Sequence, residues 1–325
     1  MKQRNFAVIG RNFVVDDFLA AAAERRDVRL LGVYSRRADT GRAFADKHGA
    51  ERVYTDLDAL SGDGDLDFVY VASPNICHEA QTVRLLEGGR HVLVEKPAAP
   101  TLAGFDRMAA SAERNGRVLM EAMMPAHMPA LETVRAWLPR IAPVRTADFS
   151  YCQYSSRYDK FKAGIVENAF DPTLCNGALM DIGIYCTLWI AALFGTPREL
   201  QCAGSFLPGS IDADGAFLAQ YDGFVCRVAY SKIADSAQPC EIAGEGGCIR
   251  IDRASRPREV TLTLRGGGTE SFRIPDARRE MSYELADFLA CLDGASPEPF
   301  LEITRTALGV TDRVRDLLGI NFQKK

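Results

Sequence analysis

The chain has 325 residues, 47% of them hydrophobic and 25% charged, and its formal net charge is −4. This balance is typical of an ordinary globular protein, and the length favours two domains over a single hydrophobic core. Lys and Arg are scattered rather than clustered, which argues against nucleic acid and acidic membranes as partners. The first apolar run, residues 6–10, is too short for a signal peptide or a membrane span. We therefore expect a cytoplasmic protein.

The nine cysteines and four histidines show no pattern typical of a metal site. No two cysteines have CxxC spacing, and no histidine pairs with a cysteine or carboxylate at ligand spacing. Most cysteines stand in apolar stretches, as small buried side chains do in a reducing compartment. We expect neither a bound metal nor disulfide bonds.

In the first part of the chain, short β-like runs alternate with helical patterns. Strands are expected at residues 6–9, 28–34, 66–72, 91–94 and 117–120. Helices are expected at residues 13–26, 40–48, 77–87 and 101–115. Strands that alternate with helices pair in parallel through right-handed crossovers. The pattern predicts an α/β domain with a doubly wound parallel sheet over residues 1–124.

The pattern changes after residue 124 and predicts an α+β domain over residues 125–325. Helices are expected at residues 130–138, 177–194, 279–292 and 303–318. Strands are expected at residues 144–154, 199–206, 215–221, 224–230, 241–243, 248–251, 260–264 and 270–274. Turn signals between the strands favour an open, mostly antiparallel sheet with helices on one face. The other face would need a cover, so we expect a homodimer or a larger homo-oligomer.

The turn after the first expected strand reads Gly10-Arg11-Asn12-Phe13-Val14-Val15. In a doubly wound sheet such a turn presents the free amides of a helix N-terminus to phosphate groups. The usual dinucleotide fingerprint also has glycine at positions 12 and 15, so only Gly10 matches it. Asn12 is a partial substitute, because asparagine enters the left-handed region readily, whereas Val15 excludes a close helix–strand contact. Alone, this turn fits a dinucleotide site and a plain strand-to-helix connection equally well.

The second expected strand ends in Ser35-Arg36-Arg37. A site for NAD would place Asp or Glu near this point to bind the ribose hydroxyls, whereas a hydroxyl and two guanidinium groups suit a 2′-phosphate. The alternative is that Arg36 and Arg37 are solvated charges at a helix entry. Within a dinucleotide-binding domain these residues favour NADP, with NAD possible.

Two further segments follow successive strands in register. They read Ala72-Ser73-Pro74-Asn75-Ile76-Cys77-His78 and Val94-Glu95-Lys96-Pro97. They resemble the [AS]-x-P-x-x-x-H and E-K-P elements of the Gfo/Idh/MocA oxidoreductase family. The run from Gly177 to Tyr185 and the C-terminal tail are similar to the branch that contains dimeric dihydrodiol dehydrogenase and NADP-dependent xylose dehydrogenase. The resemblance therefore spans nearly the whole chain.

The resemblance implies a dinucleotide-binding Rossmann domain over residues 1–124 and a substrate-binding and oligomerisation domain over residues 125–325. It also implies a cis bond between Lys96 and Pro97, which would aim Lys96 into the cleft. The resemblance further implies a small carbohydrate or diol substrate, with cofactor contacts from the following residues: Gly10, Arg11, Asn12, Phe13, Ser35, Arg36, Arg37, Ala72, Ser73, Pro74, Asn75, His78, Glu95, Lys96 and Pro97.

The matched positions suggest Lys96 and Tyr185 as the catalytic pair. Hydride transfer to a carbonyl needs a proton donor at the oxygen, and the reverse reaction needs a base. A tyrosine phenol has an ordinary pKa of about 10, and a neighbouring lysine ammonium would lower it. Sugar and inositol dehydrogenases of the family usually have His where this chain has Tyr185, so Tyr185 points to the diol, glucose–fructose and xylose branch. The alternative is a plain core tyrosine in an apolar helix.

Three more residues are candidates for substrate binding. Asp181 lies four residues before Tyr185, on the same face of the expected helix, and could hold a substrate hydroxyl, or it could serve only the helix dipole. Tyr154 and Arg157 stand in a loop rich in aromatic, hydroxyl and charged side chains after an expected strand. Such loops contact polyols, but they also line subunit interfaces.

The sequence thus predicts an NADP-dependent dehydrogenase or reductase that transfers a hydride between the nicotinamide and a sugar, polyol or vicinal diol. Two other readings within the family stay open. A non-catalytic nucleotide-sensing regulator would fit the altered turn at Asn12 and Val15, although such a protein has no need of Lys96 and Tyr185. A glycosidase that uses tightly bound NAD for transient oxidation would not need Ser35-Arg36-Arg37.

Overall fold

The computed structural model describes residues 3–275 and 279–322 and divides the chain into two compact units. The first contains the chain up to Met123 and a later segment that ends at Glu302, and the second holds the rest. The later segment includes α9 (Met281–Leu292), which packs on α1 (Phe13–Ala23). Its Phe288 ring meets Phe68 of the first sheet edge-on at 5.2 Å. The sequence predicted this helix in the second domain, whereas its contacts group it with the first unit. Its apolar stripe alone does not say which core it joins.

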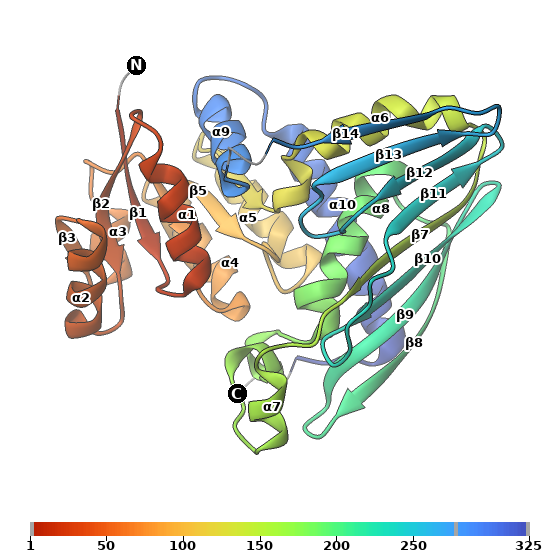
Figure 1. The fold of residues 1–325 in the computed structure, drawn as a ribbon. Helices are drawn as coiled ribbons and strands as arrows, with labels where there is room; N and C mark the ends of the chain where they lie inside the picture. The colour runs from red at the N-terminus through yellow and green to blue at the C-terminus, as the bar shows by residue number, and fades with distance from the viewer. Residues whose placement is uncertain (1–2, 276–278, 323–325) are drawn as a thin grey trace. The chain divides into compact units, whose positions relative to one another are not determined.

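The first unit contains the doubly wound sheet that the sequence predicts. Six parallel strands lie in the order β3-β2-β1-β4-β5-β6 (Figure 1). The order reverses between β1 and β4, where this fold places its ligands. Strands β4, β5 and β6 consist almost entirely of buried residues, as expected for a sheet covered on both faces. The strands are β1 (Arg4–Ile9), β2 (Val28–Tyr34), β3 (Arg52–Tyr54), β4 (Phe68–Val71), β5 (His91–Glu95) and β6 (Leu119–Ala122).

Side chains cap the starts of some helices of the first unit. Thr101 accepts a hydrogen bond from the Gly104 amide at the start of α5, and Asp56 accepts one from Asp58 at the start of α3. Helices α4 and α5 pack on each other, as α1 and α9 do. The helices not yet bounded are α2 (Ala38–His48), α3 (Leu57–Ser61), α4 (Asn75–Glu87) and α5 (Leu102–Arg114).

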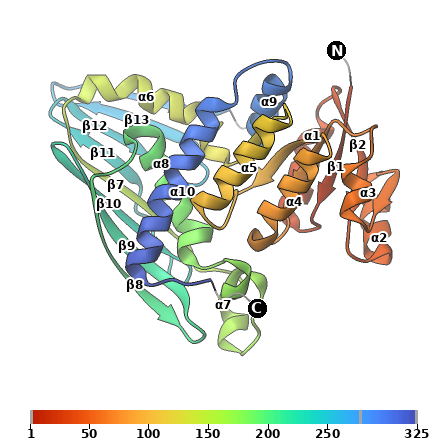
Figure 2. The ribbon, with the colours of Figure 1, turned by 180° about the vertical axis from the view of Figure 1, so that it is seen from behind.

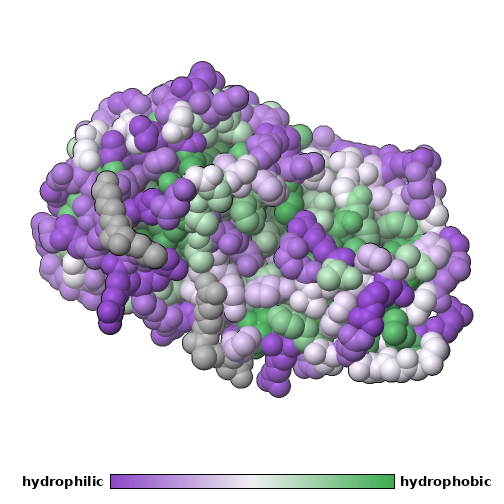
Figure 3. Space-filling view, turned by 90° about the horizontal axis from the view of Figure 1, so that it is seen from above, coloured by the Kyte–Doolittle hydropathy of each residue, from purple (hydrophilic) through white to green (hydrophobic). Residues whose placement is uncertain are grey.

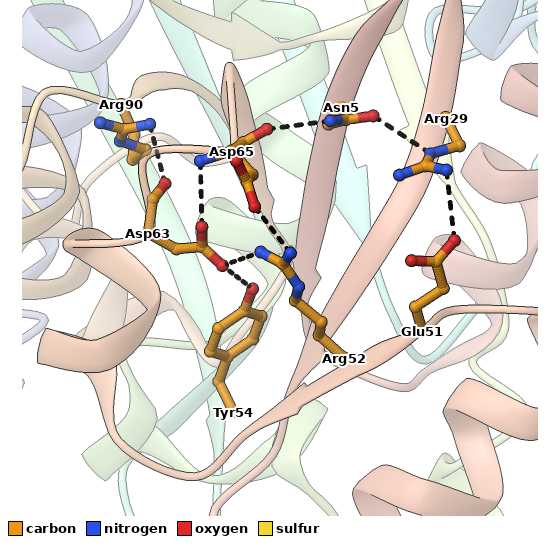
Figure 4. Close-up of polar contacts among 8 residues, drawn as sticks. All are labelled: Asn5, Arg29, Glu51, Arg52, Tyr54, Asp63, Asp65 and Arg90. Atoms are coloured by element: carbon orange, nitrogen blue, oxygen red, sulfur yellow. Dashed lines mark hydrogen bonds and ion pairs between the residues drawn. The ribbon is translucent and has the colours of Figure 1, made fainter.

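A polar network holds β3, which the sequence analysis missed, at the edge of this sheet (Figure 4). Asp63 accepts hydrogen bonds from Arg52 at 2.6 Å and from the Tyr54 hydroxyl at 2.5 Å. Arg52 also reaches Asp65, at 2.6 Å, and Arg90 donates to the Asp63 carbonyl at 3.0 Å. Desolvation raises the pKa of Asp63, but the bonds from Tyr54, Asp65 and Arg52 outweigh it, so the net pKa is below its usual value.

Replacing Asp63 with Asn should lower the free energy of unfolding by about 1–3 kcal/mol at pH 7, because bonds to a charged, mostly buried acceptor are lost. The folded-state pKa of Asp63 is depressed, so its contribution is complete above the ordinary value of about 3.9 and disappears as the pH falls through the folded value. Urea unfolding between pH 7 and 3 should therefore show the two proteins converging towards acid pH. Asp65→Asn, at a mostly exposed site, is the control and should cost less than about 1 kcal/mol. A difference that stays constant down to pH 3 would contradict this assignment.

The second unit is built on a mixed, mostly antiparallel sheet of eight strands, in the order β14-β13-β12-β11-β7-β10-β9-β8. Only the central pair of β7 and β10 is parallel, and the other neighbours are antiparallel. The strands are β7 (Val144–Cys152), β8 (Glu199–Leu207), β9 (Ile211–Tyr221), β10 (Phe224–Ser231), β11 (Cys240–Gly244), β12 (Gly247–Ile251), β13 (Glu259–Leu264) and β14 (Thr269–Arg273).

Helices cover one face of this sheet, as Figures 1 and 2 show from two sides. The expected helix over residues 177–194 is interrupted, because its first turn, η4 (Leu179–Gly183), is π-helical. Such turns are rare and are frequent at functional sites. The helical segments are η1 (Met124–Ala126), α6 (Pro129–Ile141), α7 (Tyr158–Lys162), η2 (Asn168–Phe170), η3 (Pro172–Leu174), η4, α8 (Ile184–Phe194) and α10 (Glu298–Leu318), whose first residues belong to the first unit.

The opposite face of the second sheet mixes apolar and charged side chains. Leu218 and Val225 are 43% and 39% exposed, and beside them Arg227 forms a double hydrogen bond with Asp148. Figure 3, a view from above, shows hydrophilic side chains interspersed with apolar patches. Assembly of two or more copies stays a prediction. Within the described residues, no helix combines the length and apolar character that crossing a membrane requires.

Candidate functional site

The turn after β1 is shaped by a close approach of two chain segments. Gly10 has φ +116°, and a Cβ there would lie 2.4 Å from the Ala72 carbonyl oxygen, so only glycine fits. Asn12 was expected to use its tolerance of the left-handed region, but this is wrong, because its φ is −97°. Asn12 instead caps α1: its side chain accepts from the Val15 amide at 3.1 Å and donates to the Ala72 carbonyl at 3.3 Å. The turn keeps its form without the two further glycines.

The segment after β2 separates the roles of its three polar residues. Ser35 is buried, and its hydroxyl lies 3.1 Å from that of Thr40. Arg37 is exposed and makes a double hydrogen bond with Asp39, at 3.1 and 2.5 Å. Arg36 forms no hydrogen bond or ion pair with any residue in the described part of the chain. Its charge acts on the Cys77 thiol: burial raises the pKa of that thiol, and Arg36 lowers it in part. Arg36 therefore lies near the start of α4.

His78 connects the turns that follow β4 and β5. The ring is 1% exposed, with Nε2 2.8 Å from the Ser73 carbonyl oxygen and Nδ1 2.9 Å from that of Pro97. Burial lowers the pKa of His78. Ser73 also donates to Gln81 at 2.7 Å. The buried His78 ring thus links the two turns, which is a structural role. The cofactor contact predicted for His78 from the sequence would be a second role.

The end of β5 carries Lys96 between two buried glutamates. The Lys96–Pro97 bond is cis, as the resemblance implies. Glu95 accepts from the Tyr70 hydroxyl at 2.6 Å and from the Lys96 amide at 3.2 Å, and burial raises the pKa of Glu95. Glu121 at the end of β6, which the sequence analysis did not select, accepts from the Ala98 amide at 2.7 Å. These bonds hold the backbone on both sides of the half-buried Lys96.

This edge of the first sheet fits a dinucleotide. The amides of the first turn of α1 have no carbonyl partner within the helix. Gly10 precedes this turn and has no side chain that would block a phosphate from the amides. Phe13 and Ile76, in the first turns of α1 and α4, are 58% and 44% exposed at the same edge. Arg36 supplies positive charge at the end of β2. The turns after β1, β2, β4 and β5 thus bring most of the expected cofactor residues to one edge.

In the second unit, Tyr185 is the second residue of α8, directly after the π-helical turn. It is half-buried, and its ring meets that of Tyr151 on β7 edge-on, with centroids 5.6 Å apart. The sequence predicted Asp181 and Tyr185 on one face of a regular α-helix. The structure replaces the regular first turn of that helix with a π-helical turn.

Asp181 has a partner that the sequence analysis missed. Its Oδ2 lies 2.9 Å from Nζ of Lys232, which directly follows β10. The Lys232 side chain is 2% exposed, and Asp181 is 34% exposed. The sequence shows only a single lysine at the end of a strand whose alternate residues are buried. That pattern does not distinguish a buried lysine from a solvated one at a strand end.

Asp212 anchors the start of the same helical segment. It is 2% exposed and accepts from the Leu179 amide at 2.6 Å. A Cβ at Gly177 would lie 1.7 Å from Asp212 Oδ1, so the absence of a side chain there makes room for the carboxylate. Burial raises the pKa of Asp212 to about 6, although the helix amides and Lys232 lower it in part. Asp212 was not among the residues predicted from the sequence.

Tyr154 and Arg157 bind within their own loop. The Tyr154 hydroxyl donates to Asp159 at 2.7 Å and accepts from Lys162 at 2.7 Å. Arg157 forms an ion pair with Glu167 at 3.3 Å. These partners account for the loop's mixed composition without a substrate. Among the substrate candidates, only Asp181 lies on the same helical segment as Tyr185.

Comparisons with known proteins agree with this fold. Residues 4–123 match the oxidoreductase family with an NAD-binding Rossmann fold, and residues 140–250 match the GFO/IDH/MocA C-terminal domain. The chain is 41% identical to the scyllo-inositol 2-dehydrogenase (NADP(+)) IolU of Bacillus subtilis, over 98% of both chains. It is 25% identical to the trans-1,2-dihydrobenzene-1,2-diol dehydrogenase of Oryctolagus cuniculus, over 97% of this chain and 98% of that one.

A solved structure has the same architecture over nearly the full length. The aldose-aldose oxidoreductase from Caulobacter crescentus superposes with a TM-score of 0.84 at 22% identity, over 97% of each chain. Both matched domains, their order along the chain and the full-length relatives lead to one assignment. The chain belongs to the Gfo/Idh/MocA family of oxidoreductases.

Proposed function

We propose that this protein is an NADP-dependent dehydrogenase that oxidises a CH–OH group of a cyclic polyol, or reduces the corresponding ketone. The observation that carries the proposal is the 41% identity, over 98% of both chains, with a relative named scyllo-inositol 2-dehydrogenase (NADP(+)). The more distant relatives are named for a dihydrobenzene diol. That diol has vicinal hydroxyl groups on a ring, as a cyclic polyol does. Inositol-like rings therefore rank above open-chain sugars as substrates.

The first unit would hold the cofactor through the turns described above. The turn at Gly10 and the N-terminus of α1 would bind the pyrophosphate, and Arg36 with the buried Ser35 would bind the 2′-phosphate. The segment from Ala72 to His78 would line the same edge. When bound, the nicotinamide accepts a hydride from the alcohol carbon or returns it.

Lys96 and Tyr185 would carry out the proton transfer to and from the substrate oxygen. In the oxidation, Tyr185 takes the proton of the reacting hydroxyl as general base, and in the reduction it returns that proton to the carbonyl oxygen. Lys96 contributes positive charge that favours the phenolate and binds the substrate oxygen. Asp181, on the turn before Tyr185, accepts a hydrogen bond from a neighbouring hydroxyl and orients the ring.

Steady-state assays of purified protein test the proposal. NADP+ reduction should be followed with scyllo-inositol, myo-inositol, glucose and trans-dihydrobenzenediol, each in parallel with NAD+. We expect saturable turnover with scyllo-inositol or another inositol, and a higher kcat/KM with NADP+. Turnover confined to glucose or to the diol would overturn the substrate class. Binding of NADPH without turnover on any of them would favour the nucleotide-sensing regulator.

A further inference from the structure

Lys232 occupies a position that is unusual for a lysine. Its side chain is 2% exposed, and burying an ammonium is costly unless it is paired and hydrogen-bonded. Its Nζ lies 2.9 Å from Asp181 Oδ2 and donates to the Ala169 carbonyl at 2.6 Å. It also stands 4.8 Å from the centre of the Phe170 ring, within the range of a cation–π contact. The ammonium is therefore held from several sides.

These contacts join three segments that are distant in sequence. Lys232 follows β10, Ala169 and Phe170 lie in η2, and Asp181 lies in the π-helical turn η4. The Lys232 backbone is also hydrogen-bonded on both sides: its amide donates to the Ala213 carbonyl, and its carbonyl accepts from the Ser155 amide. Asp181, by contrast, is 34% exposed and so can meet a ligand as well as Lys232. A fixed buried cation thus holds a partly exposed carboxylate.

Two other titratable groups lie around this pair. Asp212 on β9 is affected by the charge of Lys232, and it accepts the Leu179 amide at the start of the turn that carries Asp181. The hydroxyl of Tyr230 on β10 is buried near Asp212, and burial raises the pKa of Tyr230. Lys232 is thus the cation next to two carboxylates, of which Asp181 is the more exposed.

We infer that Lys232 is a positioning residue that keeps Asp181 ionised and oriented as the acceptor for a substrate hydroxyl. The inference rests on the proposed function for the role of Asp181, and it adds Lys232, to which that proposal assigns no part. An ionised carboxylate accepts hydrogen bonds only, so it selects a hydroxyl next to the reacting carbon in one orientation. Without Lys232, a proton on Asp181 would convert it partly into a donor.

Lys232→Met is the principal test, with Lys160→Met as the matched control. Lys160 pairs with Glu167 at 2.6 Å in the same unit but is 55% exposed. Protein with 13C-labelled aspartate carboxyl groups would be titrated by NMR, and the Asp181 signal would be identified by its absence in Asp181→Asn. The Asp181 carboxyl should titrate about one to three pH units higher in Lys232→Met than in the wild type. It should not move in Lys160→Met.

The same variants would be assayed with scyllo-inositol and NADP+. In Lys232→Met, kcat/KM should fall about ten- to a hundredfold, mainly through a higher KM for the polyol, while NADPH affinity is unchanged. The acidic limb of its pH profile should shift upwards with the NMR titration. An unchanged Asp181 titration, or an unchanged KM and pH profile in an active protein, overturns the inference.

Two measurements keep the test decisive if Lys232→Met is unstable or the substrate is wrong. The double variant Asp181→Asn/Lys232→Met removes both charges, so it should melt at a higher temperature than Lys232→Met, which leaves a carboxylate without its cation. An equal or lower melting temperature for the double variant contradicts the pairing. If the wild type turns over none of the polyols, the proposed function fails, whereas the titration and the melting comparison still decide whether Lys232 controls Asp181.

Discussion

Replacing Tyr185 with Phe is expected to lower kcat at least about a hundredfold while leaving NADPH binding intact. The variant removes one oxygen and keeps the half-buried ring, whose edge-to-face contact with Tyr151 holds it at the start of α8. General acid–base catalysis contributes about 10²- to 10⁴-fold to a rate, so the loss should lie in that range. The measurement is steady-state turnover with saturating polyol and NADP+, beside a fluorescence titration with NADPH.

Tyr151→Phe provides the control for Tyr185→Phe. It removes a hydroxyl that donates to Gln153 at 2.9 Å and preserves the aromatic contact with Tyr185. Its kcat should stay within about threefold of the wild type, because no proton transfer depends on it. If Tyr185→Phe kept full activity, the proton would have to come from another group. If both variants lost activity equally, the Tyr151 hydroxyl would matter as much as the Tyr185 hydroxyl, and the proton transfer could not be assigned to Tyr185 alone.

Much of the first unit could be predicted because its strands have a strong local signal. Buried runs such as residues 66–72 and 91–94 stand between amphipathic helices, and that alternation is enough for a doubly wound sheet. Strand β3 was missed because it has only three residues, and two of its side chains, Arg52 and Tyr54, owe their place to Asp63 in a later loop. Such a strand has no periodicity of its own to detect.

The candidate site was predictable only where a motif marks it. The elements around His78 and Lys96 each follow a strand, so topology brings them to one edge of the sheet. Tyr185 was selected with the diol branch in mind, yet the chain is 41% identical to a relative named for scyllo-inositol and 25% identical to one named for the diol. The residue type at this position and the overall identity therefore favour different relatives.

Long-range pairs explain what the sequence analysis missed. Lys232 meets Asp181, and Asp212 meets the Leu179 amide, only after β9, β10 and the helical segment have assembled. Asn12 was expected to replace a glycine by its backbone conformation, but it acts through its side chain as a helix cap. For Lys232 and Asp212 the residue type was visible, whereas the partner was set by packing across the fold.

Replacing Arg36 with Gln is expected to weaken NADPH binding about ten- to a hundredfold and NADH binding by less than about threefold. Charge-assisted bonds to a phosphate contribute about 1.5–3 kcal/mol, which corresponds to that loss, and NADH has no 2′-phosphate. Arg36 is the better candidate of the two arginines, because Arg37 already donates twice to Asp39. Fluorescence titrations of each variant with both reduced cofactors provide the measurement.

The matched control is the double variant Arg37→Gln/Asp39→Asn. In Arg37→Gln alone, the Asp39 carboxylate would lose the cation with which it pairs. Asp39 lies near Arg11, and its uncompensated negative charge would itself repel a phosphate. The double variant removes both members of a pair that is exposed and neutral overall, so NADPH affinity should stay within about threefold of the wild type. If the double variant lost as much NADPH affinity as Arg36→Gln, Arg37 would share the phosphate despite its bond to Asp39. If Arg36→Gln lost NADPH affinity and NADH affinity equally, Arg36 would contact a group that both cofactors contain. The preference for NADP would then have to come from another residue.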